Sequence, residues 1–463
     1  MTIPKRFEQI LTKPIVAELA KLFEEKDFEI YLVGGSVRDV FLGQVHEDLD
    51  FTTGASPEEI EEIVKDWADE VWTIGKTYGT IGLSKWGSKA EITTFRSEIY
   101  ERDSRHPKVT FSKTIEEDLK RRDFTVNAMA LRLPKGELID PHNGLGDLGT
   151  KILKTPQNPE KSFTDDPLRM LRALRFISAL GFSLEKETAK SIKALAERLS
   201  IISKERVADE LSKLLLGAYP AIALRSLIAL GLSEFVVPEL PSLKMARDPQ
   251  FHHKDVLEHT FKVVESVKPD LVLRLSALLH DIGKPSTRII DKGKVHFYGH
   301  DVLGARMARK RLRELRYPKE IIEKVVKLIR LHLRPYNYAM GWTDSGVRRY
   351  ARDAGELLPR LNQLAVADCT TRIPEKCKRN LELILDLEKR IKILNEQEEI
   401  AKIRAPIDGT EIMEYLGIGP GKIVGEALKM LLDAKLDDKI KTKEEAYELL
   451  DKWATNKEKL EES

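Results

Sequence analysis

Hydrophobic and polar positions follow two different periods along the chain. Between residue 28 and about residue 133, short runs rich in β-branched and aromatic residues alternate with helical segments. Five of these runs are predicted to be strands, namely FEIYLVGG (28–35), DLDFTT (48–53), TIGLSKW (80–86), AEITTFR (90–96) and KVTFS (108–112). From residue 165 onward, apolar residues recur every three or four positions, which is the period of an amphipathic helix.

The helical period is clearest in three segments, DDPLRMLRALRFISALG (165–181), KETAKSIKALAERL (186–199) and ADELSKLLLG (208–217). Each segment has an apolar face with charged residues opposite. Proline-containing breaks fall near residues 236–242 and 334–336. The pattern predicts an α+β fold in which a small mixed-sheet head is followed by an extended all-α body.

Length and composition narrow the class of protein. A chain of 463 residues is too long for one compact core, so we expect several domains. Basic and acidic residues nearly cancel to a formal net charge of +2, so any contact with RNA would come from local basic patches. The two cysteines, Cys369 and Cys377, form neither a disulfide framework nor a zinc-binding spacing. Because no apolar stretch resembles a signal peptide or a membrane span, we expect a cytoplasmic protein with no membrane contact.

Paired glycines and paired acidic residues stand out in the first part of the chain. Gly34 and Gly35 follow a predicted strand, where glycine lets backbone N–H groups approach a phosphate; an ordinary tight turn is the alternative. Asp48 and Asp50 lie two residues apart in a strand and therefore point to one face. Two such carboxylates suit Mg²⁺ in two-metal phosphoryl transfer, whereas the alternative is a solvated strand edge. Glu91, on a later strand, is a third candidate.

Four motifs occur in order along the chain: GGSVRD (34–39), DLD (48–50), RRDFTVNA (121–128) and DDPLR (165–169). Together they resemble the class II tRNA nucleotidyltransferase and bacterial poly(A) polymerase family, most strongly between residues 31 and 216. The resemblance implies four domains: a nucleotidyltransferase head (1–150), a neck with nucleobase-reading helices (151–217), a body with an HD phosphohydrolase-like domain (218–372) and a helical, tRNA-binding tail (373–463).

The resemblance also implies a role for each motif residue. Asp48 and Asp50 would bind two Mg²⁺ ions, and Glu91 would complete the catalytic carboxylates. Asp166 and Arg169 would read the base of CTP or ATP by hydrogen bonding, in place of a template. Asp165 would orient Arg169 from one helical turn away. The triphosphate and sugar would be held by Gly34, Gly35, Arg38, Arg122, Asp123, Asn127 and Arg172.

Residues 95–108 are polar and charged, with neither helical nor strand periodicity. By the same resemblance they form the flexible loop that helps to switch the pocket from CTP to ATP. Its presence favours addition of the full CCA sequence over CC alone; an ordinary exposed hairpin loop is the alternative.

A glycine-rich turn, GIGPGKIVG (417–425), lies between two predicted helices near the end of the chain. Its backbone N–H groups and Lys422 could hold an RNA phosphate, or it could be a plain turn between helices. Basic clusters at residues 306–316 and 376–379 are either RNA-facing or solvated helix faces.

Histidine and aspartate recur in later segments, in VLEHT (256–260), LLHDIGK (278–284), GHD (299–301), RLH (330–332) and VAD (366–368). A single histidine on an apolar helix face is usually structural, but this ordered series resembles the ligands of HD phosphohydrolases. The resemblance implies metal ligands at His259, His280, Asp281 and Asp368, with His300 and His332 as the extra ligands of two-metal versions.

Mixed imidazole and carboxylate ligands favour Mn²⁺, Ni²⁺ or Co²⁺ over Mg²⁺. The resemblance is to the subgroup of bacterial tRNA nucleotidyltransferases with an HD domain, and it implies phosphatase and 2′,3′-cyclic phosphodiesterase activity. In that case Lys284 would contact the phosphate. The alternative is a helical scaffold without activity.

The sequence therefore predicts an enzyme that adds C, C and A to the 3′ end of tRNA from CTP and ATP, with Mg²⁺ and without a template. Its partners would be the acceptor end and elbow of tRNA, and it would be a monomer or a homodimer. One alternative is a poly(A) polymerase, although those enzymes usually carry a long basic tail and this chain ends in EKLEES. Another is an A-only or CC-only adding enzyme. A third, of a different class, is a metal-dependent phosphohydrolase with an RNA-binding head.

Overall fold

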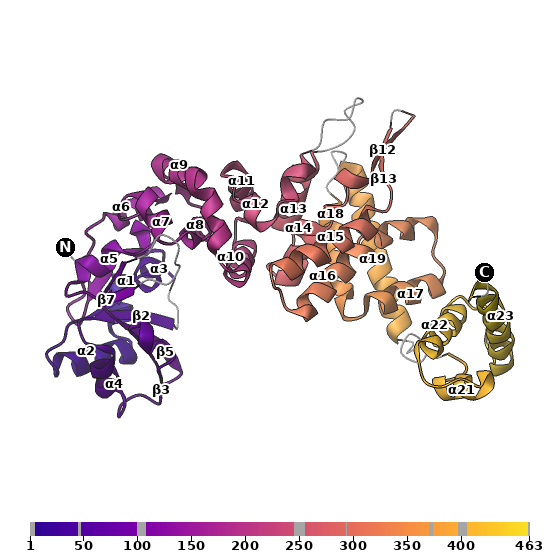
Figure 1. The fold of residues 1–463 in the computed structure, drawn as a ribbon, viewed down its shortest axis with the longest axis horizontal. Coiled ribbons are helices and arrows are strands. Elements are labelled where there is room, and N and C mark those ends of the chain that lie inside the picture. Colours follow the sequence, from indigo (N-terminus) through magenta and orange to yellow (C-terminus); the bar gives the residue numbers. More distant parts are fainter. Residues whose placement is uncertain are drawn as a thin grey trace. The chain divides into compact units, whose positions relative to one another are not determined.

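The computed structural model describes residues 5–44, 48–99, 108–244, 255–292, 294–369, 374–396 and 405–461. The chain divides into two compact units, Met1–Pro241 and Ser242–Ser463 (Figure 1). The boundary falls in the proline-containing break at residues 236–242. The first unit holds the mixed sheet and the second is almost wholly helical, which confirms the predicted fold class. The finer division into four domains stays a prediction.

A seven-stranded mixed sheet forms the centre of the first unit. Its strand order is β3-β4-β5-β2-β1-β8-β9, and β2 and β5 are parallel whereas the other neighbours are antiparallel. The strands are β1 (Ile30–Val33), β2 (Asp48–Thr53), β3 (Glu70–Trp72), β4 (Thr80–Lys85), β5 (Ser88–Thr94), β8 (Ala130–Arg132) and β9 (Glu137–Ile139). All four residues of β1 are buried, as expected of a central strand covered on both faces.

Short helices pack around this sheet: α1 (Lys5–Leu11), α2 (Pro14–Glu24), α3 (Gly35–Phe41), α4 (Pro57–Val64), α5 (Ile115–Lys120) and α6 (Gly144–Thr150). On one side, Tyr31 and Val33 of β1 form a buried cluster with Ile115 and Leu119 of α5. Helix α4 begins with a capping box. The Ser56 side chain accepts a hydrogen bond from the backbone N–H of Glu59, and the Glu59 side chain accepts one from the backbone N–H of Ser56. Local capping and a shared apolar core thus stabilise the helices around the sheet.

The first part of the expected flexible loop, residues 96–99, is a strand where the sequence predicted no regular structure. Strand β6 (Arg96–Ile99) pairs antiparallel with β7 (Lys108–Phe111). Backbone pairing with β7, which the sequence predicted as a strand (108–112), stabilises β6. Residues 100–107, the rest of the expected loop, lie outside the described residues.

The helices that follow the head are α7 (Pro159–Asp165), α8 (Leu168–Leu180), α9 (Lys186–Leu195), α10 (Lys204–Leu216), α11 (Pro220–Ala229) and α12 (Ser233–Val236). A short parallel pair, β10 (Ile152–Leu153) with β11 (Ser183–Leu184), links the chain before α7 to the connection between α8 and α9. Helix α7 ends at Asp165, Asp166 is extended with φ −133°, and Pro167 precedes α8. The expectation that Asp165 and Arg169 share one helix is therefore wrong, because the chain turns between them.

The second unit consists mainly of helices: α13 (Val256–Ser266), α14 (Leu271–Leu279), α15 (His300–Glu314), α16 (Lys319–Leu331), α17 (Asp344–Ala354), α18 (Leu358–Asp368), α19 (Pro374–Glu396), α21 (Gly409–Leu416), α22 (Lys422–Leu436) and α23 (Lys443–Glu461). One hairpin, β12 (Arg288–Asp291) with β13 (Lys294–Phe297), precedes α15. None of the described helices combines the length and apolarity needed to cross a bilayer.

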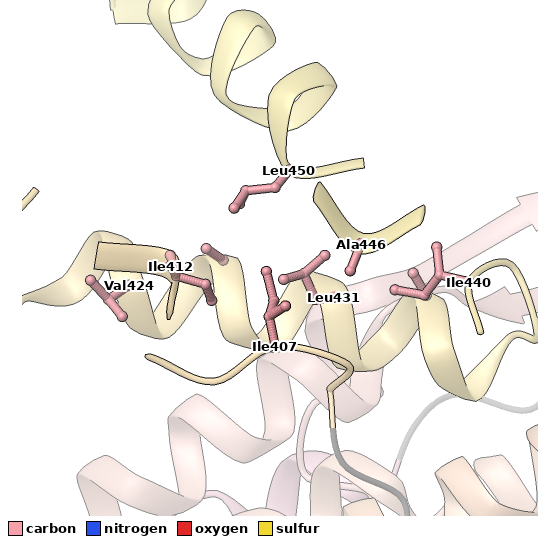
Figure 2. Packing of buried hydrophobic residues seen from close by; sticks show 9 residues of the cluster. Ile407, Ile412, Val424, Leu431, Ile440, Ala446 and Leu450 are labelled. Carbon is pink, nitrogen blue, oxygen red and sulfur yellow. The ribbon is translucent and has the colours of Figure 1, made fainter. Parts of the chain in front are cut away.

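The last three helices bury an apolar cluster of their own, seen in Figure 2 between α21, α22 and α23. Ile412, Leu431 and Leu450 are fully buried in it. The glycine-rich turn expected at residues 417–425 lies between α21 and α22, and Gly417 ends α21 in the left-handed conformation. The two helices on either side of this turn were therefore predicted correctly, whereas contact of the turn with RNA stays a prediction.

Candidate active site

Three acidic residues lie on one face of the central sheet. Along β2, Leu49 and Phe51 are buried, whereas Asp48 and Asp50 alternate with them on the opposite face. Asp50 pairs in register with Glu91 on the neighbouring parallel strand β5. Burial raises the pKa of Asp50, Arg122 opposes that rise, and the carboxylates of Glu91 and Asp48 add to it. Such a concentration of like charge is relieved when a cation binds.

This face forms the floor of a pocket of about 1130 Å³. Asp50 and Glu91 line the pocket, whereas Asp48 lies outside its lining. Most of the other predicted nucleotide-binding residues line it as well: Gly34, Gly35, Arg38, Arg122, Asp123, Asn127, Asp166, Arg169 and Arg172. Asp165 is not among the lining residues. The structure therefore gathers residues from the four sequence motifs into one cavity.

The paired glycines lie between β1 and α3, against one wall of this pocket. Gly34 has φ +67° and ψ −131°, a conformation that side chains other than hydrogen rarely tolerate. A Cβ atom at this position would lie only 2.9 Å from Nη1 of Arg122. The turn therefore requires glycine, and any side chain here would also displace the guanidinium group of Arg122.

Arg38 is held in place by two side chains. Its Nε and Nη2 donate to the two carboxylate oxygens of Asp39 at 2.8 and 2.9 Å, and its Nη1 donates to Oδ1 of Asn127 at 2.7 Å. Nδ2 of Asn127 in turn donates to Asp123 Oδ1 at 2.9 Å. This chain of bonds fixes the arginine fork beside the pocket before any ligand binds.

Asp123 connects the head to helix α8. Its Oδ2 accepts from Nε and Nη2 of Arg172 at 2.9 and 2.6 Å. Burial alone would raise the pKa of Asp123, but Arg172, Asn127 and Arg169 hold it far below its usual range. The carboxylate is therefore ionised and serves as a fixed anchor for Arg172.

A second buried carboxylate organises the RRD motif. Asp118, fully buried on α5, accepts from Arg121 at 2.7 and 2.9 Å and from Arg122 at 3.1 and 3.4 Å. Burial would raise the pKa of Asp118, but the two guanidinium groups hold it below its usual value. Its importance was missed in the sequence, since nothing local marks it as buried.

The residues expected to read the base lie at the start of α8. Arg169 donates from Nη1 to Ser162 Oγ at 2.8 Å and from Nη2 to the carbonyl oxygen of Arg121 at 2.6 Å. Asp166 caps the first turn by accepting from the backbone of Leu168 at 3.1 Å, and its other oxygen lies 3.9 Å from Nη2 of Arg206. The contacts that hold Arg169 are thus Ser162 and the backbone of Arg121.

Several pocket residues were missed by the sequence interpretation. Arg175 lies three residues after Arg172 on the same helix. Residues at i and i+3 share a helix face, so this spacing could have placed Arg175 beside Arg172 in the pocket. The guanidinium groups of Arg38, Arg172 and Arg175 lie 5.3, 5.8 and 4.6 Å from the ring centroid of Phe176, within cation–π range. Trp72 and Tyr78 also line the pocket, and no local signal in the sequence marks them.

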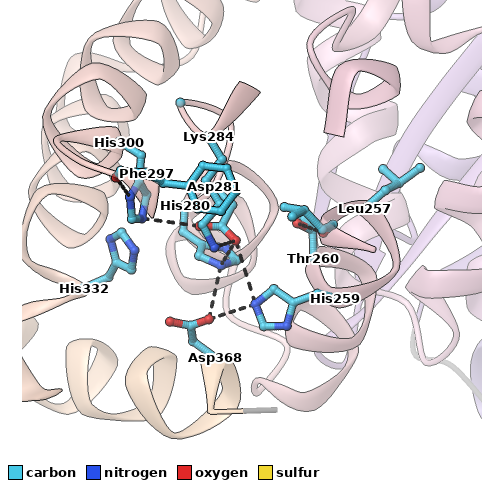
Figure 3. Close-up of polar contacts among 12 residues, drawn as sticks. Leu257, His259, Thr260, His280, Asp281, Lys284, Phe297, His300, His332 and Asp368 are labelled. Atoms are coloured by element: carbon cyan, nitrogen blue, oxygen red, sulfur yellow. Dashed lines mark hydrogen bonds and ion pairs between the residues drawn. The ribbon is translucent and has the colours of Figure 1, made fainter. Parts of the chain in front are cut away.

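The second predicted site lies in the second unit, where the six expected ligand residues converge (Figure 3). One group of possible ligand atoms comes from His259, His280 and Asp368, and another from Asp281, His300 and His332; within each group the atoms lie within 4.8 Å of one another. They come from α13, the end of α14, the start of α15, the end of α16 and the end of α18. Asp48, Asp50 and Glu91 do not form so tight a group in the described structure.

Three of these histidines are oriented in the same way. Nδ1 of His280, His300 and His332 lies 2.8, 2.7 and 2.6 Å from a backbone carbonyl oxygen, so each ring directs Nε2 toward the centre of the site. Nε2 of His300 and of His332 has no hydrogen-bond partner among the described residues. A backbone-anchored ring with an unpaired, buried Nε2 is the usual arrangement of a metal ligand.

The charged side chains of this site shift one another's pKa values. Burial alone would lower the pKa of His280, but Asp281 and Asp368 raise it to about 10. Burial and the charge of His280 lower the pKa of His332 to about 4. Lys284, expected to meet a phosphate, lies 2.6 Å from Asp281 Oδ2. Tyr336, which the sequence did not reveal, donates to Asp368 Oδ2 at 3.0 Å and fixes that carboxylate. The donor set fits a metal that prefers imidazole with carboxylate.

Three family models match the chain: "Poly A polymerase head domain" over residues 30–154, "Probable RNA and SrmB- binding site of polymerase A" over 181–243 and "HD domain" over 251–373. The fold and the pocket thus define a nucleotidyltransferase of the poly(A) polymerase type.

Curated relatives identify the family within this class of nucleotidyltransferases. The A-adding tRNA nucleotidyltransferase of Deinococcus radiodurans is 35% identical over 75% of this chain and 82% of its own length. The CC-adding tRNA nucleotidyltransferase of Thermus thermophilus is 32% identical over 93% and 95% of the two chains. Among solved structures, the Bacillus stearothermophilus CCA-adding enzyme in complex with CTP has a TM-score of 0.68 at 26% identity and covers 97% of this chain and 100% of its own. The chain belongs to the tRNA nucleotidyltransferase family.

Proposed function

We propose that this enzyme adds C, C and A in turn to the 3′ end of tRNA, using CTP and ATP and no nucleic-acid template. The proposal rests on one observation: the same pocket holds the carboxylates Asp50 and Glu91, arginines suited to a triphosphate, and the pair Asp166 and Arg169. Its volume of about 1130 Å³ leaves room for a nucleotide and the end of an RNA together. Two relatives are named for parts of this addition, one as an A-adding and one as a CC-adding tRNA nucleotidyltransferase.

In the proposed reaction the 3′-hydroxyl of the RNA attacks the α-phosphate and pyrophosphate leaves. Asp48, Asp50 and Glu91 fit Mg²⁺, because that ion usually takes one or two carboxylates and completes its shell with water and substrate phosphates. When bound there, Mg²⁺ supplies activation of the hydroxyl and neutralisation of the leaving charge. Arg38, Arg122 and the N–H groups at Gly34 and Gly35 bind the triphosphate, in the manner of a helix N-terminus that accepts an anion.

The base would be read at the start of α8. An arginine fork offers donors and an aspartate offers acceptors, so Arg169 and Asp166 can pair with the edge of cytosine or of adenine after a small rearrangement. The contacts of Arg169 to Ser162 Oγ and to the Arg121 carbonyl restrict that rearrangement to a few alternatives. Asp165 would influence Arg169 only from the end of the preceding helix.

The A-adding and the CC-adding relatives align over 82% and 95% of their own length, whereas the CCA-adding enzyme of Lactobacillus delbrueckii aligns over 59% of its own. The experiment that tests full CCA addition uses purified protein, Mg²⁺, CTP, ATP and three tRNA transcripts ending before CCA, after the first C and after CC. Extension of all three to one finished CCA end supports the proposal. Extension of the CC-ended transcript alone means an A-adding enzyme, a halt after CC means a CC-adding enzyme, and long A tails mean a poly(A) polymerase.

We further propose that the chain has the four-domain division 1–150, 151–217, 218–372 and 373–463, with the last two contacting the tRNA body. The separate apolar cluster of α21, α22 and α23 supports an independent tail. We expect the partner to be the acceptor end and elbow of tRNA, bound by a monomer or a homodimer. Sedimentation of the protein with and without tRNA measures both the oligomeric state and the stoichiometry.

A second activity is supported by the cluster of buried histidines and aspartates in the second unit. We propose that His259, His280, Asp281 and Asp368, with His300 and His332, hold Mn²⁺, Ni²⁺ or Co²⁺ and that the site hydrolyses phosphoesters, with Lys284 beside the phosphate. The supporting observation is that Nε2 of His300 and Oδ1 of Asp281 are buried, make no hydrogen bond within the described ranges and lie 3.6 Å apart. Hydrolysis of 2′,3′-cyclic AMP in the presence of each metal, compared with metal-free protein, tests it; absence of both metal binding and turnover would refute it.

A further inference from the structure

One row of residues runs across four strands of the central sheet. Trp72 on β3 pairs with Gly82 on β4, Gly82 pairs with Glu91 on β5, and Glu91 pairs with Asp50 on β2. Residues paired in register project to the same face of a sheet, and adjacent strands lie about 4.8 Å apart. The indole of Trp72 therefore lies on the same face as the two carboxylates.

The absence of a side chain at Gly82 lets the indole of Trp72 lie close to the two carboxylates. A Cβ atom at position 82 would lie 1.9 Å from Nε1 of Trp72 and 2.2 Å from its Cε2. The indole thus occupies the space that any side chain at position 82 would need, immediately next to Glu91. Trp72 remains partly exposed and lines the pocket.

The two sides of the carboxylates differ in character. On the β1 side lie Gly34, Gly35 and Arg122, which suit a triphosphate. On the β4 and β3 side, the pocket-lining residues between positions 72 and 82 are aromatic, apolar or small: Trp72, Ile74, Gly75, Tyr78, Thr80 and Gly82. One charged residue, Arg96 of β6, also lines the pocket there and donates to the carbonyl oxygen of Tyr78. Ile74 and Tyr78 are 91% and 50% exposed, so this wall is open to solvent.

An in-line displacement needs the attacking and leaving oxygens on opposite sides of the phosphorus. If the triphosphate lies toward β1, the attacking 3′-hydroxyl must come from the side of β4 and β3. An aromatic wall there suits a nucleobase, and stacking on an aromatic ring accepts any base because every base has a π-face. That tolerance matches an enzyme that must accept three different RNA ends in succession.

We propose that Trp72 is a positioning residue, whose indole stacks on the base of the terminal RNA nucleotide and places its 3′-hydroxyl beside Asp50 and Glu91. This inference rests on the proposed nucleotide transfer to RNA. It assigns the β3–β4 side of the pocket to the RNA and the β1 side to the incoming nucleotide.

The test compares W72A and W72F with the wild type and with W86A, a matched control. Trp86 is an exposed tryptophan of the same region that contacts Trp67 and lies outside the pocket lining. We expect W72A to raise KM for a tRNA ending before CCA at least about tenfold, as expected for loss of one stacked base. KM for CTP should stay within about twofold. W72F should recover most of the loss, and W86A should behave as the wild type.

Binding of a six-nucleotide RNA with the sequence of the acceptor 3′ strand, measured without nucleotide or metal, separates failure of this inference from failure of the proposed function. Weaker binding by W72A than by wild type and W86A supports the stacking role, even if no protein extends tRNA. Equal binding by all four proteins overturns it. A W72A protein whose KM rises for CTP and not for tRNA also overturns it, because the indole would then hold the incoming nucleotide.

Discussion

Replacement of Gly34 by alanine tests whether the turn after β1 holds the nucleotide. The backbone at Gly34 has φ +67° and ψ −131°, which costs a residue with a side chain of order 1–3 kcal/mol. The new methyl group would also lie 2.9 Å from Nη1 of Arg122. That arginine is the far end of a flexible chain, held to Asp118 at 3.1 and 3.4 Å, so it can shift by a few tenths of an ångström and weaken one bond. We expect G34A to lower the free energy of unfolding by about 2–4 kcal/mol.

The same shift of Arg122 in the G34A protein moves its guanidinium group away from the bound triphosphate. Loss of one charge-assisted hydrogen bond is worth about 1.5–3 kcal/mol, so KM for CTP should rise about ten- to hundredfold. The measurements are urea unfolding and initial rates of C addition at varied CTP. Gly87 provides a matched control, because it has φ +78° but no atom within 4 Å of an added Cβ and lies outside the pocket lining. G87A should cost about 1–2 kcal/mol and leave KM unchanged. A G34A protein with the KM of G87A would refute the assignment of this turn to the nucleotide.

Three further changes probe other parts of the molecule. Asp48→Ala or Asp50→Ala should abolish transfer in the extension assay while the unfolding curve stays intact; near-normal transfer would show that the carboxylates hold no catalytic metal. His280→Ala should abolish metal-dependent hydrolysis of 2′,3′-cyclic AMP and leave tRNA extension at the wild-type rate, whereas loss of both activities would indicate a folding defect. Asp118→Ala should lower the free energy of unfolding by about 3–5 kcal/mol at pH 7, because it removes the buried carboxylate that pairs with two guanidinium groups. Since Arg121 and Arg122 lower the pKa of Asp118, its contribution is present above the ordinary carboxyl pKa of about 3.9 and is lost as the pH falls through the folded-state pKa, so urea unfolding of mutant and wild type should converge in acid.

Local sequence patterns predicted the parts of the site that depend on local geometry. Asp48 and Asp50 were placed on one face because a strand alternates its side chains, and Leu49 and Phe51, which alternate with them, are buried on the other face. Placing Gly34 before α3 likewise required only a strand followed by a helix. Strands β2, β4 and β5 were found because each is short, β-branched and bounded by turn residues.

Features that depend on pairing between distant segments were not predictable in this way. The row from Trp72 to Asp50 exists only because four strands pair in one register, and register is a property of the whole sheet. The helical spacing suggested for Asp165 and Arg169 failed for a related reason: Asp165 completes a helix that begins at Pro159, and the extended Asp166 and Pro167 start a new one. A motif with a proline in its middle can close one helix as readily as it opens the next.

The two candidate metal sites differ in the chemistry of their ligands, and this difference separates the proposed activities. The head offers only carboxylates, hard oxygen donors suited to Mg²⁺ together with substrate phosphates. The second site offers four histidines and two aspartates within a buried core, a donor set that favours Mn²⁺, Ni²⁺ or Co²⁺. The two sets of ligands also belong to different compact units. An assay with Mg²⁺ alone should therefore report nucleotide transfer and miss hydrolysis, whereas adding Ni²⁺ or Co²⁺ should reveal hydrolysis in the same protein even when Asp50 has been replaced.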